Sequence, residues 1–115
     1  MIGTKDIAAQ LRRWAETQDA PQRAAFEVLD EQGHWLRNKA FIDACVHEDE
    51  FEGVVYISWW QAAEAEGELT GSSGEMAVLR FALFLAQDPV GLSSLDSSNR
   101  AIVVREFARA LGVAR

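Results

Sequence analysis

One segment, Met76–Ala86, limits what this chain can fold into more than any other. Ten of its eleven residues are apolar, and the exception is Arg80. Ser72-Ser73-Gly74-Glu75 precedes it, and a serine followed three residues later by a glutamate predicts a capped helix start. A helix that is apolar on nearly every face must be buried on nearly every face. We therefore predict a central helix that ends at Asp88-Pro89 and is surrounded by the rest of the chain.

The spacing of apolar residues, together with capping residues, predicts the other helices. The expected segments are Lys5–Gln18 capped by Thr4, a second helix from Asp19 to Gly33 with Pro21 in its first turn, a third from about Trp35 to Val46 opened by His34 or Asn38, a fourth from Trp59 to Glu66, and a last from Ser97 to Leu111 between Asp96 and Gly112. In the last helix we expect Ile102, Val103, Phe107 and Leu111 to face the core.

One segment, Val54–Ser58, is rich in β-branched and aromatic residues and predicts a short strand. No second segment has this composition, and the charged stretch His47–Glu50 is expected to be a loop. A lone strand leaves backbone N–H and C=O groups without partners. The strand must therefore pair within the chain, with a second copy or with a partner protein, and the sequence leaves all three open. After it, Ser58-Trp59-Trp60-Gln61 predicts another capping box.

The composition is that of an ordinary globular domain, with 115 residues, 49% hydrophobic and 25% charged. The expected fold is mostly α: a single domain over residues 1–115, with five or six helices around a buried central helix and one short β element. The single cysteine, Cys45, excludes an internal disulfide. The sequence after Met1 has no signal-peptide pattern, and no apolar run approaches the ~20 residues that span a bilayer. We expect a cytoplasmic protein without membrane contact.

The charge is distributed unevenly along the chain. Residues 40–79 contain nine acidic residues and no Lys or Arg, so this third carries the whole excess behind the net charge of −7. Such a surface repels nucleic-acid phosphates and attracts basic partners. It also suits plain solvation of a small protein.

No segment has the pattern of a catalytic or metal site. Asp43 and His47 have helical i,i+4 spacing, but one histidine with loose carboxylates is a poor transition-metal set. His34 stands at a helix boundary and Cys45 on a buried stripe, where a thiol is inert. A phosphate-binding Gly-rich loop with its Lys is missing. We therefore predict no catalytic residue, metal or cofactor, and no enzyme.

The leading hypothesis is a non-catalytic protein–protein interaction module, with a homodimer as one form it could take. Adjacent tryptophans on a helix point about 100° apart and are hard to bury together. The predicted contact surface consists of Trp59, Trp60, Glu48, Asp49, Glu50 and Glu52. Alternatively, both tryptophans pack under neighbouring loops.

Two other functions stay open at this stage. A nucleic-acid-associated regulator could use the last helix, which carries Arg100, Arg105 and Arg109, although the acidic total opposes that contact. A small enzyme or ligand binder could assemble its site from distant residues without a local motif.

The second half of the chain resembles a group of short, uncharacterised actinobacterial helical proteins. The similar features are Ile57-Ser58-Trp59, the Ala-rich helix after it, and Ser72-Ser73-Gly74-Glu75 leading into Met76-Ala77-Val78-Leu79. The resemblance implies a small helical fold and assigns no site residue.

Overall fold

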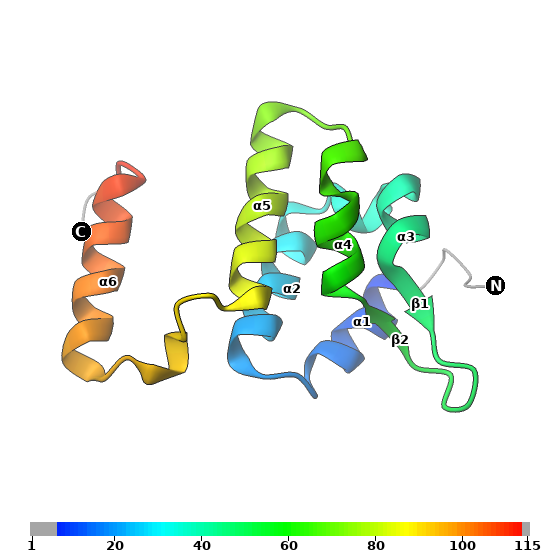
Figure 1. The fold of residues 1–115 in the computed structure, drawn as a ribbon, viewed down its shortest axis with the longest axis horizontal. Coiled ribbons are helices and arrows are strands. Elements are labelled where there is room, and N and C mark those ends of the chain that lie inside the picture. The colour runs from blue at the N-terminus through cyan, green and yellow to red at the C-terminus, as the bar shows by residue number, and fades with distance from the viewer. Residues whose placement is uncertain (1–6, 114–115) are drawn as a thin grey trace.

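The computed structural model describes residues 7–113, which form a mostly helical domain with one small β-hairpin (Figure 1). The elements in chain order are α1 (Ile7–Ala15), α2 (Ala20–Gln32), the 3-10 turn η1 (Trp35–Arg37), α3 (Lys39–Cys45), β1 (Val46–Glu48), β2 (Val55–Ile57), α4 (Trp59–Ala65), the 3-10 turn η2 (Glu66–Glu68), α5 (Ser73–Gln87), the 3-10 turn η3 (Leu92–Ser94) and α6 (Ser97–Ala110). The predicted fold class is confirmed. The predicted cap Thr4 and the first predicted helical residue, Lys5, lie outside the described residues.

The core lies between α2 and α5 and extends to α1, α3, α4 and the hairpin. Its largest fully buried side chains are those of Trp35, Phe26, Phe41, Leu11, Leu29, Leu79 and Cys45. The indole N–H of Trp35 donates to the carbonyl oxygen of Glu75 at 2.8 Å, so the polar atom of the largest core residue is satisfied. This bond ties η1 to the first turn of α5.

The capping residues predicted from the sequence begin the helices as expected. The side chains of Asp19, Asn38 and Asp96 each accept a backbone N–H at 2.9 Å at the starts of α2, α3 and α6. Ser72 and Glu75 form the complete reciprocal capping box of α5. Asn38 thus opens the third helix. The preceding residues from Trp35 to Arg37 form a separate 3-10 turn, so the predicted helix is shorter at its beginning.

The strand predicted within Val54–Ser58 pairs inside the chain, with a segment expected to be a loop. β1 and β2 are antiparallel, with Val46 opposite Ile57, His47 opposite Tyr56 and Glu48 opposite Val55. The expectation that no second strand exists was therefore wrong. Since β2 has this partner, its backbone groups do not require a second copy of the chain.

The capping box predicted at Ser58 forms only in part. The Ser58 hydroxyl accepts the backbone N–H of Gln61 at 3.4 Å. The Gln61 side chain bonds to the ring of His47 on β1 instead of returning to Ser58. The backbone N–H of Ser58 donates to the carbonyl oxygen of Cys45 at 2.8 Å, which continues the hairpin pairing. The bond between Gln61 and His47 thus replaces the bond to Ser58 that a complete capping box would contain.

The last helix, α6, differs most from the sequence expectation. It stands beside α5 at one end of the molecule (Figure 1), and only Ala108 among its residues is buried. Ile102, Val103, Phe107 and Leu111, which were expected in the core, are 44–64% exposed. The prediction that they are buried was wrong. An apolar stripe shows that a helix can pack against another surface, but it does not show that the fold provides one.

The central helix is covered incompletely for the same reason. In Figure 1, α2 lies behind α5, α4 lies beside α5 towards the hairpin and α6 lies on its other side; Leu79, Ala82, Leu83 and Ala86 of α5 are buried. On its outer side Phe84 remains 41% exposed. Within residues 7–113, no helix combines the length and the apolar character that crossing a membrane requires.

Candidate functional site

The loop between β1 and β2 is an acidic turn held by its own hydrogen bonds. One carboxylate oxygen of Asp49 accepts the backbone N–H groups of Phe51 at 2.8 Å and Glu52 at 3.0 Å. The N–H groups of Glu52 and Phe51 lower the pKa of Asp49, because they stabilise its charged form. Gly53 completes the turn with φ 68°, and its N–H donates to the Asp49 carbonyl oxygen at 2.8 Å. The loop therefore presents its side chains from an ordered backbone.

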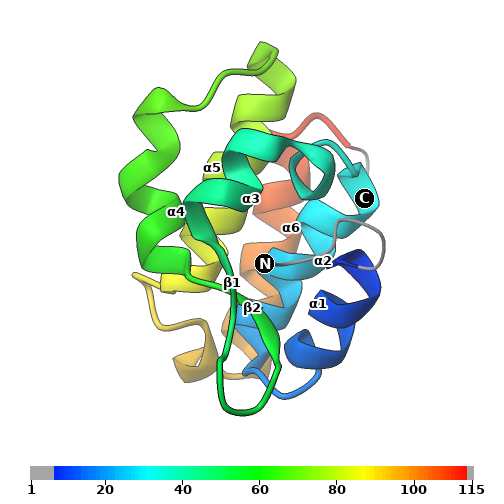
Figure 2. The ribbon, with the colours of Figure 1, turned by 90° about the vertical axis from the view of Figure 1, so that its right-hand side faces the viewer.

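Phe51 is the most exposed large apolar side chain among the described residues, at 95%. It stands in this turn between Glu50 and Glu52, which are both exposed. Figure 2 shows the loop projecting beyond the helices. Sequence reasoning missed Phe51 because a single aromatic residue among acids has no periodic pattern. Its isolation between charged neighbours was the available signal, since such a residue cannot be covered by its own segment.

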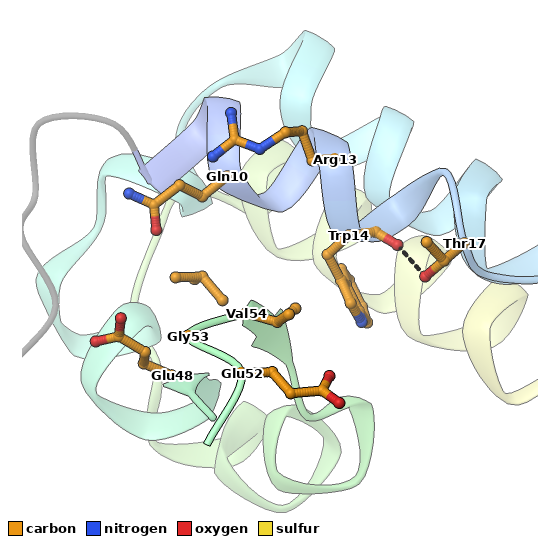
Figure 3. A pocket seen from close by; sticks show the side chains of 9 residues that line it. Gln10, Arg13, Trp14, Thr17, Glu48, Glu52, Gly53 and Val54 are labelled. Carbon is orange, nitrogen blue, oxygen red and sulfur yellow. Dashed lines mark hydrogen bonds between the residues drawn. The ribbon is translucent and has the colours of Figure 1, made fainter. Parts of the chain in front are cut away.

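The hairpin and α1 enclose an open groove of about 630 Å³ (Figure 3). From α1 and the turn after it come Gln10, Arg13, Trp14 and Thr17, and from the hairpin come Glu48, Glu52, Gly53, Val54 and Val55. Figure 3 places the guanidinium of Arg13 on the α1 side and the carboxylates of Glu48 and Glu52 on the hairpin side. The groove combines an aromatic wall with side chains of opposite charge.

The adjacent tryptophans predicted to form a contact surface have different environments. Trp59 is 9% exposed and packs on Trp14 with ring centroids 6.5 Å apart. Trp60 is 70% exposed. This division follows from their helical positions, which point them in different directions. Both lie at the start of α4, directly after β2, whereas the acidic turn is at the other end of the strands. The structure therefore brings Glu48, Asp49, Glu50 and Glu52 together with Phe51, and places Trp60 at the base of the hairpin.

The residues considered for catalysis have structural partners. The Cys45 thiol is buried and donates to the carbonyl oxygen of Phe41 at 3.2 Å, and burial raises its pKa to about 12. His34 lies 3.1 Å from the carboxylate of Glu75, and His47 bonds to Gln61. Asp43, paired in the sequence with His47, instead bonds to Lys39 at 2.6 Å. Within residues 7–113, no three His, Cys, Asp or Glu side chains are grouped to hold a metal ion.

The arginines of α6 are partly neutralised within the helix. Arg105 and Arg109 each donate to the same carboxylate oxygen of Glu106 at 2.9 Å. Two of the three positive charges on this helix thus share an internal acidic partner, which weakens the field available to a phosphate backbone.

No family model, curated protein or solved structure matches the chain. The resemblance to actinobacterial helical proteins stays a prediction.

Proposed function

We propose that this chain is a non-catalytic interaction module that binds a basic segment of another protein through the acidic hairpin. The observation that carries the proposal is the 95% exposure of Phe51 at an ordered, acidic turn. Aromatic side chains that become buried on binding supply a large share of interface energy. The turn holds the backbone of Phe51 in place, which reduces the backbone conformational entropy lost on association.

The charge of the hairpin supports a basic partner. Glu48, Glu50 and Glu52 lie around Phe51 without an ion pair among the described residues. Basic side chains of a partner would find unneutralised carboxylates at the rim while an apolar residue of the same segment contacts Phe51. Rim charges of this kind mainly set association rate and specificity. Arg13 on the opposite wall of the groove would bond to a carbonyl or carboxyl group of the bound segment.

A display selection tests the proposal and does not require an identified partner. Random peptides on phage are selected against the immobilised full chain, and the affinities of enriched peptides are measured by fluorescence anisotropy. We expect sequences that combine Lys or Arg with an apolar residue. Phe51→Ser should weaken their binding roughly tenfold or more, since truncating an interface anchor costs about 2 kcal/mol or more and about 1.4 kcal/mol corresponds to tenfold. Binding should also weaken at high salt.

A matched control distinguishes binding at the hairpin from nonspecific hydrophobic binding. Val90 is also an exposed apolar residue, at 61%, and lies in the loop after α5. Val90→Ser should leave peptide affinity unchanged, and neither substitution should change the melting temperature, because both side chains are exposed. Enrichment of acidic peptides, or of peptides that bind the Phe51→Ser chain equally well, would show that the hairpin is not the binding surface.

A further inference from the structure

The apolar stripe of α6 remains largely uncovered by the rest of the molecule. Val103, Val104, Phe107, Ala108 and Leu111 lie on neighbouring positions of the helix, at the spacing of an amphipathic stripe. Ala108 is buried, whereas the other four are 44–64% exposed. Single exposed apolar residues are ordinary on a monomer, but a whole stripe on one helix marks a contact surface.

The stripe continues onto α5 through a row of aromatic rings. Phe107 stacks on Phe81 with centroids 5.5 Å apart and planes 13° apart, and Phe81 stacks on Phe84 at 6.5 Å and 20°. Phe84 is itself 41% exposed. The two helices run antiparallel side by side in Figure 1. Together they form an α-hairpin with an incompletely buried apolar face, which we call the α5–α6 face.

The exposed apolar area on this face is close to what a stable interface needs. Its members are 41–64% exposed and comprise Phe84, Val103, Val104, Phe107 and Leu111. If each exposes roughly half of its side chain, with about 200 Å² for an aromatic and somewhat less for an aliphatic residue, the sum is on the order of 450 Å² of apolar area. One partner of a standard interface contributes about 800 Å² in total, of which a little more than half, roughly 450 Å², is apolar.

The shape of the molecule agrees with an unfilled contact. The radius of gyration is 15.2 Å, and the extents are 45 × 31 × 23 Å. A compact domain of this length has a radius of gyration of about 13 Å. In Figure 1, α6 and the hairpin occupy opposite ends of the long axis. α6 therefore lengthens the molecule but adds few buried residues to it.

The charge distribution permits a second copy of this chain as the occupant. Each copy carries −7, and residues 40–79 hold nine acids without a base, whereas residues 80–115 hold five bases and three acids. Two copies that meet through α6 would touch where neither is acidic and would keep their acidic hairpins at the far ends. Apolar faces are self-complementary, so a two-fold pairing can close and bury both.

We propose that the chain forms a two-fold homodimer through the α5–α6 face, in which α5 and α6 of both copies build a four-helix layer. Antiparallel helix pairs with exposed apolar stripes reach closed packing in this way. The contact lies away from the acidic hairpin, so the proposal stands independently of the function proposed above. In such a dimer both hairpins would remain free, and a partner with two basic segments could bind both.

Sedimentation velocity on the full chain tests the dimer over roughly 1–200 μM. We expect a species of twice 12.8 kDa at the higher concentrations. Val104→Asp should weaken the dimer on the order of 100-fold, because it would bury an unpaired charge in the interface. Circular dichroism and thermal melting at the lowest concentration check that this variant folds, which is expected because Val104 is 56% exposed.

The matched control is on the same helix. Ile102 is 45% exposed and lies about 140–180° around the helix from Val104, Phe107 and Leu111. Ile102→Asp introduces the same charge on the opposite side and should change the dissociation constant less than about threefold. A wild-type chain that stays monomeric at 200 μM, or two variants with equal effects, would overturn the proposal. A monomer that instead binds duplex DNA through α6 would assign the helix to nucleic acid and overturn it as well.

Discussion

At the scale of single residues, Cys45 is the clearest case of chemistry suppressed by packing. Its thiol is fully buried, and burial raises its pKa to about 12. Because the thiolate is the reactive form, we expect no reaction with a maleimide or disulfide reagent at pH 8.5 in the folded chain, and full reaction in urea. Ellman-type titration measures both. Labelling of the native chain as fast as the unfolded chain would show that Cys45 is accessible.

The same shift has a consequence for stability at alkaline pH. The folded pKa of Cys45 lies above its unfolded value of about 8.5. The contribution of the buried thiol to the free energy of unfolding is therefore fully present below about pH 8.5. It is lost as the pH rises from there towards 12. Alkaline unfolding should begin later in Cys45→Ala when both chains are compared relative to their own stability at pH 7.

The capping box of α5 gives a second prediction for a single residue. The Ser72 hydroxyl accepts the N–H of Glu75 at 3.1 Å, and the Glu75 carboxylate accepts the N–H of Ser72 at 2.7 Å. Ser72→Ala should lower the free energy of unfolding by about 1 kcal/mol in urea titrations. Ser73→Ala, at the next and also exposed position, serves as the control and should be nearly neutral. Equal effects of the two substitutions would mean that the cap contributes little.

At the scale of elements, the sequence predicts those structures whose determinants are local. Asp19, Asn38, Ser72 and Asp96 begin helices because a side chain three residues before an N–H can reach it in any context. β1 could not be predicted in this way. His47 and Glu48 have no strand composition, and they become a strand because β2 and the Asp49 turn place a partner beside them.

The same difference between local and tertiary determinants applies to the candidate site. The acidic cluster Glu48–Glu52 could be predicted from the sequence, because the charge of these side chains does not depend on how the chain folds. The burial of Trp59 and the exposure of Trp60 were not, because they depend on where Trp14 of α1 packs. The groove in Figure 3 was not predictable either, since α1 and the hairpin are far apart in sequence and meet only in the fold.

The turn of the hairpin can be tested through its glycine. Gly53 has φ 68°, which L side chains rarely adopt, although a Cβ there would meet no atom within 4 Å. Gly53→Ala should therefore cost about 1 kcal/mol through backbone strain alone. Gly67→Ala is the control, because Gly67 also has open space but no positive φ. Urea unfolding of both variants should show a loss only at Gly53, and a neutral Gly53→Ala would indicate that the turn adjusts freely.

At the scale of the whole molecule, stability should be unevenly distributed between the body and α6. The core residues of α2 and α5 are mutually buried, whereas α6 buries Ala108 alone among its residues. Segments with few buried contacts open locally at a small cost in free energy. In dilute solution, amide hydrogens of α6 should therefore exchange much faster than those of α2.

The exchange rate of α6 at different protein concentrations tests whether the chain forms the proposed dimer. If a second copy covers α6, mass action raises the free energy of opening α6 as the dimer becomes populated. Hydrogen exchange measured by mass spectrometry at about 1 and 200 μM should show slower exchange in peptides from residues 97–110 at the higher concentration. Peptides from α3, which lies away from α6 in Figure 1, should be unchanged and serve as the internal control. Exchange in α6 that is as slow as in α2 at 1 μM, or that ignores concentration, would mean that the stripe is stabilised without a partner copy.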